Sequence, residues 1–473
     1  MDNVPLCVDL DGTLVRTNTL LETALGALKK NPLFIFSIVR ALFISKAQVK
    51  HRIGQQFSIL ESPLPYNEEF LAWIKKQHEA GRRLILATAS DKAIAVQIAK
   101  ELGIFDDVIA STPQLSITAN GKYAVLCQLF GTNGFSYAGN SKSDLAVWNC
   151  AKSAIVVDAP YRISSRIRKN IPVEKVFTTQ KNSTIRVFAK TMRIHQWVKN
   201  VLLFVPPLAA HEIAQPLVAF HALFGFISFS LLASAVYMFN DIADIGTDRM
   251  HSTKKYRPIA SGQISLKQSI ALGSICVFAS IVLSLLFLPA SFLGILAIYL
   301  AINICYSLFA KKIAYLDILI LAGLYVLRIF AGSFATGIST SKWLFIWTLF
   351  FFLSLAIVKR VIELLRLNDT LKKAHGRGYH KNDLEILKYT GIASATASII
   401  ILAMYIRSSS IFVLYANPLL LWIVVVLVAA WLARIWTLAL QQKLPDDPVL
   451  FAAKDPVSYA AVLAVIATML LAS

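Results

Sequence analysis

Long apolar runs recur through the second part of this chain and restrict most strongly what it can fold into. They begin near residue 197, and each approaches the roughly 20 residues that a helix needs to cross a bilayer. We expect about nine membrane-spanning helices, near residues 198–214, 217–239, 269–288, 290–309, 314–335, 343–361, 391–406, 418–438 and 456–472. Pro206 and Pro207 interrupt the first run. The sequence therefore predicts an all-α polytopic membrane domain over residues 181–473.

Residues 1–180 show another pattern, in which short apolar strands alternate with helices. Candidate strands lie near residues 6–8, 83–87 and 154–157, and a further one begins near Phe135. This alternation is typical of a parallel, doubly wound α/β sheet, which binds ligands beyond the carboxyl ends of its strands. We therefore expect a Rossmann-like N-terminal domain with a helical insert over residues 19–78. The five cysteines show no paired spacing, which predicts no disulfide framework.

The charge of the chain fits a membrane enzyme. The formal net charge is +20 although only 16% of the residues are charged. Basic residues cluster on the side of the soluble domain, as at Lys254, Lys255 and Arg257, whereas the opposite loops offer only Lys342 and Arg407. The positive-inside rule then places the N-terminal domain in the cytoplasm of a bacterial inner-membrane protein. The basic loops would face anionic lipid and phosphate substrates, so we expect no nucleic-acid partner.

An acidic motif, Asn-Asp-Ile-Ala-Asp-Ile-Gly-Thr-Asp, follows the apolar run that ends near Phe239. If the helix continues through it, Asp241, Asp244 and Asp248 share one face. Three carboxylates so close together repel one another unless a cation lies between them. Magnesium suits such a site, because it takes a few carboxylates and leaves positions for water and substrate phosphates. We predict that Mg²⁺ binds here, with Asn240 as a further ligand.

The first strand ends in Asp9-Leu10-Asp11-Gly12-Thr13, and this stretch resembles the haloacid dehalogenase-like phosphatases. The resemblance covers roughly residues 4–160. It implies that Asp9 is the nucleophile, which forms an aspartyl-phosphate, and that Asp11 is the general acid/base. It further implies that Thr88 and Lys122 bind the phosphate.

The fourth motif of that family is represented by residues 139–144. Asn140 stands where the family usually has aspartate. The resemblance implies a magnesium site formed by Asp9, Asp11, Asn140 and Asp144, with weaker metal binding because asparagine supplies a neutral oxygen. A phosphatase scaffold without catalysis remains an alternative.

Residues 190–473 resemble the UbiA superfamily of intramembrane prenyltransferases. The resemblance is carried by the acidic motif, by Arg257-Pro258 and by Ser261-Gly262. Typical members have a second Asp-x-x-x-Asp motif after the sixth helix, but this chain has Lys359-Arg360-Val361-Ile362-Glu363. That departure resembles the polyprenyl-phosphate phosphoribosyltransferase branch, whose substrates are phosphoribosyl diphosphate and a lipid phosphate.

These two substrates carry more negative charge than one prenyl diphosphate, so extra fixed cations are expected. Arg328 stands out because it lies well inside the fifth predicted span, where arginine is costly and marks a site or a buried ion pair. We predict that phosphate groups in the membrane domain are bound by Lys199, Asn200, Arg257, Lys311, Arg328, Lys359 and Arg360.

The sequence thus favours a magnesium-dependent transferase that moves 5-phosphoribosyl from phosphoribosyl diphosphate to a polyprenyl phosphate. The fused domain would then remove the 5-phosphate. One alternative is prenyl transfer from a polyprenyl diphosphate to an aromatic or other acceptor. Another is a transporter or lipid-binding protein with a degenerate phosphatase-like domain, against which the intact acidic motif argues. Nothing in the sequence specifies an oligomeric state.

Overall fold

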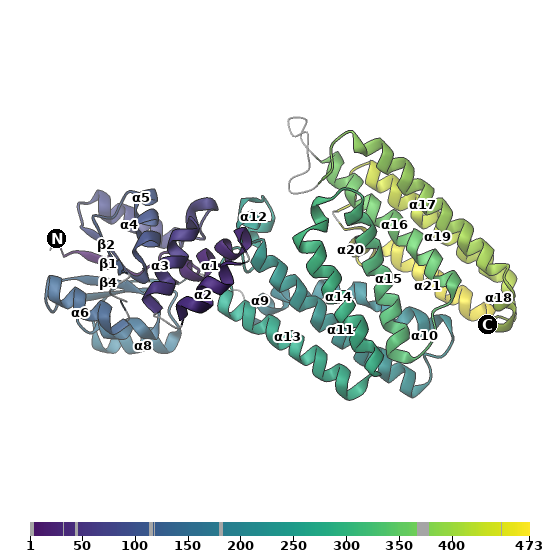
Figure 1. Cartoon of the computed structure of the whole chain (residues 1–473), viewed down its shortest axis with the longest axis horizontal. Coiled ribbons are helices and arrows are strands. Elements are labelled where there is room, and N and C mark those ends of the chain that lie inside the picture. Colours follow the sequence, from purple (N-terminus) through teal and green to yellow (C-terminus); the bar gives the residue numbers. More distant parts are fainter. Residues whose placement is uncertain are drawn as a thin grey trace. The chain divides into compact units, whose positions relative to one another are not determined.

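The computed structural model describes residues 4–31, 33–42, 46–112, 117, 119–178, 183–366, 378–445 and 447–473. It divides into two compact units (Figure 1). The first comprises Met1–Met192 and Met238–Leu272, and the second comprises Arg193–Tyr237 and Gly273–Ser473. The acidic motif therefore belongs to the same compact unit as the N-terminal domain.

The first unit contains a six-stranded parallel sheet with the strand order β3-β2-β1-β4-β5-β6. Its strands are β1 (Leu6–Val8), β2 (Leu84–Asp91), β3 (Asp107–Ser111), β4 (Ser136–Gly139), β5 (Ser153–Val157) and β6 (Val173–Phe177). The order reverses at β1, so β1 lies between β2 and β4. The predicted doubly wound α/β fold is confirmed.

Both faces of the sheet are buried. Leu6 and Val8 of β1 pack in one apolar cluster with residues of α4 (Glu68–Glu79) and α5 (Lys92–Leu102). Cys7 packs in another with residues of α6 (Ala119–Phe130), α7 (Leu145–Trp148) and α8 (Tyr161–Asn170). Successive strand side chains point to opposite faces, so an apolar strand such as β1 needs helices on both. Cys127 and Cys150 form one disulfide, a pair that the sequence analysis did not predict.

The helical insert between β1 and β2 forms as expected. It contains α1 (Thr19–Lys30), α2 (Phe34–Leu42), α3 (Lys46–Gln56) and η1 (Ile59–Glu61), while α4 belongs to the sheet domain. The side chain of Asn18 caps α1 by accepting a hydrogen bond from the amide of Leu21. Ala27, Phe34, Val49 and Ile53 form a small apolar core that joins the three helices of this cap.

Residues 238–272 complete the first unit. They contain the last turn of α11 (Pro216–Ala243), then α12 (Ile245–Met250), η4 (Lys254–Tyr256) and the first turn of α13 (Leu266–Phe287). Their apolar side chains Ile242, Ile259, Ile264 and Leu266 pack with residues of α1 and of α9 (Thr184–Thr191). We call residues 238–272 the motif segment.

The second unit is all-helical. Its further elements are α14 (Ala290–Leu308), η5 (Ala310–Lys312), α15 (Leu316–Thr336), α16 (Lys342–Leu365), α17 (Asp383–Ile406), α18 (Ser409–Leu414), η6 (Pro418–Leu420), α19 (Leu421–Leu440), α20 (Pro448–Ala452) and α21 (Pro456–Ala472). Within the described residues, seven helices are long and apolar enough to span a membrane. The helical membrane fold is thus confirmed.

The count of about nine spans is not confirmed. Residues 456–472 form a helix of 17 residues, shorter than the other seven. The predicted first span, 198–214, is instead the 3₁₀ helix η3 (Ile194–Phe204) followed by the short helix α10 (Val205–Ala209). Pro206 and Pro207 lie in the first turn of α10, the only part of a helix where missing N–H donors cost little. The chain therefore begins a new, short helix at Val205 instead of continuing one helix through residues 198–214.

The broken segment is held by a close backbone approach. A Cβ atom at Gly332 of α15 would lie 2.0 Å from the carbonyl oxygen of Leu203 in η3. Leu203 itself is fully buried. Irregular backbone is tolerated at membrane depth where protein covers it. Gly332 thus allows η3 to lie directly against α15.

Gly332→Ala should therefore destabilise the chain by about 1–3 kcal/mol, because the added methyl forces η3 away from α15. Gly323→Ala on the same helix is the matched control, since a Cβ there meets no atom within 4 Å. It should be neutral or stabilising by up to about 1 kcal/mol. Thermal unfolding in detergent measures both, and equal unfolding temperatures for the two variants would contradict this packing.

Candidate active sites

The first candidate site lies at the carboxyl ends of β1 and β4. The Lys122 ammonium is 2.6 Å from Asp9 Oδ1 and 3.7 Å from Asp144 Oδ1. Lys122 also donates to the Tyr137 hydroxyl at 2.9 Å, which in turn donates to Asp144 at 2.9 Å. Burial raises the pKa of Asp9, Lys122 lowers it and Asp144 raises it, and together they bring it to about 7. The structure therefore brings the predicted nucleophile Asp9 together with a basic group, Lys122, and a second acid, Asp144.

Asp11 lies at the junction with the cap. Its carboxylate accepts hydrogen bonds from the amide of Thr19 and from the Ser90 hydroxyl, both at 2.7 Å. Thr88 is buried, and its hydroxyl oxygen accepts a hydrogen bond from the Ser90 amide at 3.0 Å. The hydroxyl of Ser90, which the sequence analysis missed, is the one that reaches the predicted acid/base.

Asn140 also reaches this edge of the sheet. A Cβ at Gly12 would lie 2.2 Å from the Asn140 side-chain nitrogen, so the amide packs directly on the Gly12 backbone. Gly12 has φ +81°, a conformation that favours glycine. The backbone N–H of Asn140 donates to Asp144 Oδ2 at 3.2 Å. Asp9, Asn140 and Asp144 thus present oxygen atoms of the kind that Mg²⁺ prefers.

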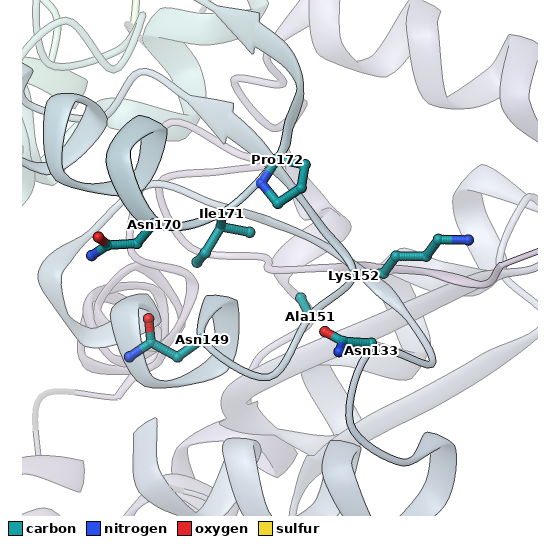
Figure 2. A pocket seen from close by; sticks show the side chains of 7 residues that line it. All are labelled: Asn133, Asn149, Ala151, Lys152, Asn170, Ile171 and Pro172. Carbon is teal, nitrogen blue, oxygen red and sulfur yellow. The ribbon is translucent and has the colours of Figure 1, made fainter.

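A pocket at the opposite edge of the sheet has a different character (Figure 2). Its volume is about 460 Å³, and it is lined by Asn133, Asn149, Ala151, Lys152, Asn170, Ile171 and Pro172. These residues precede β4, β5 and β6 or lie on the adjoining turns. The lining contributes one charged side chain, Lys152, and no carboxylate, and the predicted catalytic residues lie at the opposite edge of the sheet.

The second candidate site is the acidic motif in the same unit. Arg257 donates to Asp241 at 3.0 Å and to Asp248 at 2.6 Å. Both acids are nearly buried, with 7% and 4% of their surface exposed. Their repulsion is offset by the guanidinium between them. Asp241 and Asp248 therefore converge as the sequence predicts, with Arg257 as their common partner.

Asp244 departs from that arrangement. Helix α11 ends at Ala243 and α12 begins at Ile245, so the uninterrupted helix assumed for the motif does not form. Asp244 occupies the N-cap position of α12 without a side-chain capping hydrogen bond, and its φ of −100° and ψ of 12° lie outside the helical region. Its carboxylate lies 3.6 Å from the Lys29 ammonium of the cap. The three acids do not share one helix face, because the chain bends at the middle one.

Within the described residues, no three His, Cys, Asp or Glu side chains converge as a metal cluster. At each candidate site a basic side chain, Lys122 or Arg257, bridges two carboxylates instead. The oxygen donors fit magnesium in kind. Binding of Mg²⁺ by these acids and by Asn240, which is half-buried at the end of α11, stays a prediction.

A third cluster lies in the second unit around the ring of Tyr325. The Lys199 ammonium lies 5.9 Å from the ring centroid and forms an ion pair with Asp447. Lys359 lies 3.8 Å from the same carboxylate. Burial disfavours the charge of Asp447, but Lys199 and Lys359 lower its pKa to about 2. Two predicted phosphate-binding lysines thus share one acid.

Arg328 faces the same ring and is nearly buried, with 4% exposed. Its guanidinium lies 5.5–5.6 Å from the ring centroids of Phe229, Tyr299 and Tyr325. Its hydrogen bonds within the described chain go to Asn200 Oδ1, at 2.9 Å, and to the Leu324 carbonyl. Both acceptors are neutral, so within the described residues the alternative of a buried ion pair with another helix is not observed for Arg328.

Arg360 and Lys311 are placed differently. Arg360 is fully buried and pairs with Asp317 at 2.7 Å and with Glu363 at 2.6 Å. Asp317 also accepts a hydrogen bond from the Tyr379 hydroxyl. This geometry favours a structural role for Arg360 over phosphate binding. Lys311 lies half-buried in η5, and its phosphate role stays a prediction.

Sequence reasoning missed Asp447. It lies in the loop between α19 and α20. Pro448 follows it directly, and aspartate before proline is a common helix start. Its side chain accepts hydrogen bonds from the amides of Val449 and Leu450 and so caps α20. The capping signal was visible, whereas the long-range pairing with Lys199 was not.

The chain thus joins a parallel α/β sheet domain in the first unit to a second unit whose long apolar helices are typical of a membrane protein. The sequence profile of the UbiA prenyltransferase family matches residues 202–471, and the chain belongs to this family.

Individual proteins are similar to the whole chain or to one part of it. The uncharacterized protein y4nM of Sinorhizobium fredii is 35% identical over 462 residues, which cover 96% of this chain and 88% of that protein. The decaprenyl-phosphate phosphoribosyltransferase of Mycolicibacterium smegmatis is 33% identical over 217 residues, covering 45% of this chain and 67% of that protein. A solved substrate-bound phosphoserine phosphatase complex covers 38% of this chain and 95% of its own, with 15% identity and a TM-score of 0.27.

Arg257→Gln should tighten the binding of Mg²⁺ alone by about tenfold, because the side chain that competes for Asp241 and Asp248 is removed. The same change should weaken binding of magnesium pyrophosphate, since a phosphate ligand is lost. Lys255→Gln is the matched control: it removes the same charge from an exposed position on the same loop. Calorimetry on the purified chain measures both affinities, and equal Mg²⁺ affinity in the two variants would contradict the bridging role.

Proposed function

We propose that the membrane domain transfers the 5-phosphoribosyl group from phosphoribosyl diphosphate to a polyprenyl phosphate. The observation that carries this proposal is the buried Arg328, whose hydrogen bonds within the described residues go to neutral oxygens. A buried cation with neutral partners is costly unless an anion joins it. A phosphate group of the donor or of the lipid would supply that anion. The 33% identity to a decaprenyl-phosphate phosphoribosyltransferase supports the same reading.

In the proposed reaction an oxygen of the lipid phosphate attacks ribose C1. A C–O bond forms there, and the bond from C1 to the diphosphate breaks to release pyrophosphate. Bound magnesium would neutralise charge on the leaving diphosphate. Asp241 and Asp248 would hold that metal, and Arg257 would exchange its carboxylate partners for phosphate oxygens. In the second unit, Lys199, Lys359 and Arg328 would bind phosphate oxygens by fixed positive charge.

Lys359 supports the assignment of the donor through its position in the sequence. It stands where typical family members carry an acidic pair, so a fixed cation takes the position of acids that recruit metal. Its ammonium shares Asp447 with Lys199. Such a site suits a donor that bears a monoester phosphate in addition to its diphosphate. A prenyl diphosphate lacks that extra phosphate.

We further propose that the N-terminal domain hydrolyses a phosphate monoester, with the phosphoribosyl lipid as its substrate. Asp9 would attack phosphorus, the ester oxygen would leave with a proton from Asp11, and water activated by Asp11 would cleave the aspartyl-phosphate. Lys122 would neutralise the phosphoryl group. We place this domain on the cytoplasmic side of a bacterial inner membrane, because the positive-inside rule assigns the basic loops between the membrane helices to that side.

The donor prediction is tested with ribose-labelled phosphoribosyl diphosphate. Label should enter the lipid fraction only when polyprenyl phosphate and Mg²⁺ are both present. Asp241→Ala and Asp248→Ala should eliminate incorporation, and Arg328→Gln should reduce it by about 100-fold or more. Lys359→Ala should weaken donor binding more than metal binding. Arg407→Gln, an exposed position at the end of α17, is the matched arginine control and should keep full activity.

Prenyl transfer from a polyprenyl diphosphate to an aromatic acid, with no ribose incorporation, would contradict the donor assignment and favour the prenyltransferase alternative.

The phosphatase prediction concerns Asp9 and Asn140. Asp9→Asn should abolish magnesium-dependent hydrolysis of a phosphate monoester, because an amide does not attack phosphorus, and should leave lipid labelling intact. Asn140→Asp should raise Mg²⁺ affinity by about tenfold by adding a charged ligand. Asn133→Asp makes the same chemical change at the opposite edge of the sheet and should alter neither quantity. An unchanged hydrolysis rate in Asp9→Asn would mean that the domain is a scaffold.

A further inference from the structure

Helix α1 of the cap links the two candidate sites of the first unit. Its first residue, Thr19, donates its amide to Asp11 at 2.7 Å, and the Thr19 hydroxyl lies 3.1 Å from that of Ser90. Near its other end, Lys29 donates to the Ala243 carbonyl at 2.9 Å, beside Asp244. The helix has 12 residues, and at about 1.5 Å per residue it is roughly 18 Å long. One rigid element therefore touches both the phosphatase-like site and the acidic motif.

The strongest contact between α1 and the motif segment is a buried ion pair. Both oxygens of Glu22 accept from Arg249, at 2.8 and 2.6 Å, and the two residues are only 7% and 8% exposed. Arg249 also donates through Nε to the Ala260 carbonyl at 2.9 Å. Thr17 donates its hydroxyl to Glu22. A fork-to-fork pair of this kind fixes orientation as well as distance.

Arg249 directly follows Asp248 in the chain, and both lie on the short helix α12. The direction in which Asp248 points is therefore tied to the position of Arg249. Asp248 shares Arg257 with Asp241. Glu22 thus acts through Arg249 on the pair of carboxylates that the proposed function assigns to magnesium and diphosphate.

The backbone and the apolar contacts add to this attachment. Gly262 has φ +72°, and a Cβ there would lie 2.6 Å from Arg16 Cβ and 2.7 Å from the Arg16 carbonyl oxygen. A Cβ at Gly246 would meet Ser62 at 3.3 Å. Leu21 and Leu25 of α1 pack against Ile242 and Ile259 of the motif segment. The motif segment therefore packs on α1 and on the residues at either end of the cap, Arg16 and Ser62, with a backbone contact at Arg16.

We propose that the cap of the haloacid dehalogenase-like domain is a positioning element of the transferase, and that Glu22 is its main positioning residue. The cap holds α12, and with it Asp248, in the orientation that binds magnesium diphosphate. This inference rests on the proposed use of the acidic motif, but not on the identity of the group transferred. It gives the fused domain a role in the membrane reaction that is separate from any hydrolysis at Asp9.

The test compares Glu22→Gln with Glu61→Gln in the full chain. Glu61 is the matched control, because it forms an exposed ion pair with Lys30 within the cap. Two readouts are needed: hydrogen exchange of the peptides covering residues 245–262 without metal, and the Kd for magnesium pyrophosphate. Glu22→Gln should speed the exchange and raise the Kd about tenfold. The Glu61→Gln control should change neither.

Unchanged exchange, or faster exchange with an unchanged Kd, would overturn the positioning role. Where Glu22→Gln fails to fold, Lys29→Met decides, because Lys29 is exposed on α1 and contacts the end of α11. It should raise the Kd about threefold, and an unchanged value would again overturn the proposal. Phosphoribosyl diphosphate and a prenyl diphosphate both carry a diphosphate group, and magnesium pyrophosphate represents that group for either donor. A wild-type chain that transfers no ribose but shows the Glu22 effect therefore refutes only the proposed function.

Discussion

A basic side chain held between two carboxylates is the interaction on which both candidate sites of the first unit depend. Lys122 joins Asp9 to Asp144, and Arg257 joins Asp241 to Asp248. Two acids this close and this buried would otherwise repel each other strongly. The basic group keeps each pair in place with its oxygens directed to one point. In the proposed reactions a phosphate would take over the basic group while magnesium takes the two acids, so that both bind at the same site.

The second unit handles charge in another way. Asp447 partly offsets Lys199 and Lys359, whereas Arg328 is stabilised by three aromatic rings and by neutral oxygens. Aromatic faces attract a cation without neutralising it. The cluster around Tyr325 therefore retains positive charge, which is the property that a site for several phosphate groups requires.

The sequence predicted the features that depend on local pattern. The strand at residues 6–8 was predicted from its apolar residues. The acids that follow it marked the edge of the sheet where the candidate site lies, because strand ends are encoded locally. The 3₁₀ segment at residues 194–204 was not predicted, since it depends on the close approach of Gly332 to Leu203. The break between α11 and α12 at Asp244 was not predicted either, and the contact of Asp244 with Lys29 joins residues far apart in the chain. Asp447 and the burial of Arg360 against Asp317 are likewise pairings between residues far apart in the chain, which no local pattern reveals.

The central claim is that phosphate-rich donors, rather than prenyl diphosphates, are the substrates of the membrane domain. The most direct measurement is mass analysis of the lipid product formed by the purified Asp9→Asn chain, given polyprenyl phosphate, Mg²⁺ and both phosphoribosyl diphosphate and a prenyl diphosphate. The account predicts a lipid heavier by one phosphoribosyl group, with one pyrophosphate released for each lipid converted. An aromatic acid is included in the same mixture as the competing acceptor. The account would be contradicted if the polyprenyl phosphate stayed unmodified while the prenyl group of the prenyl diphosphate was transferred to the aromatic acid.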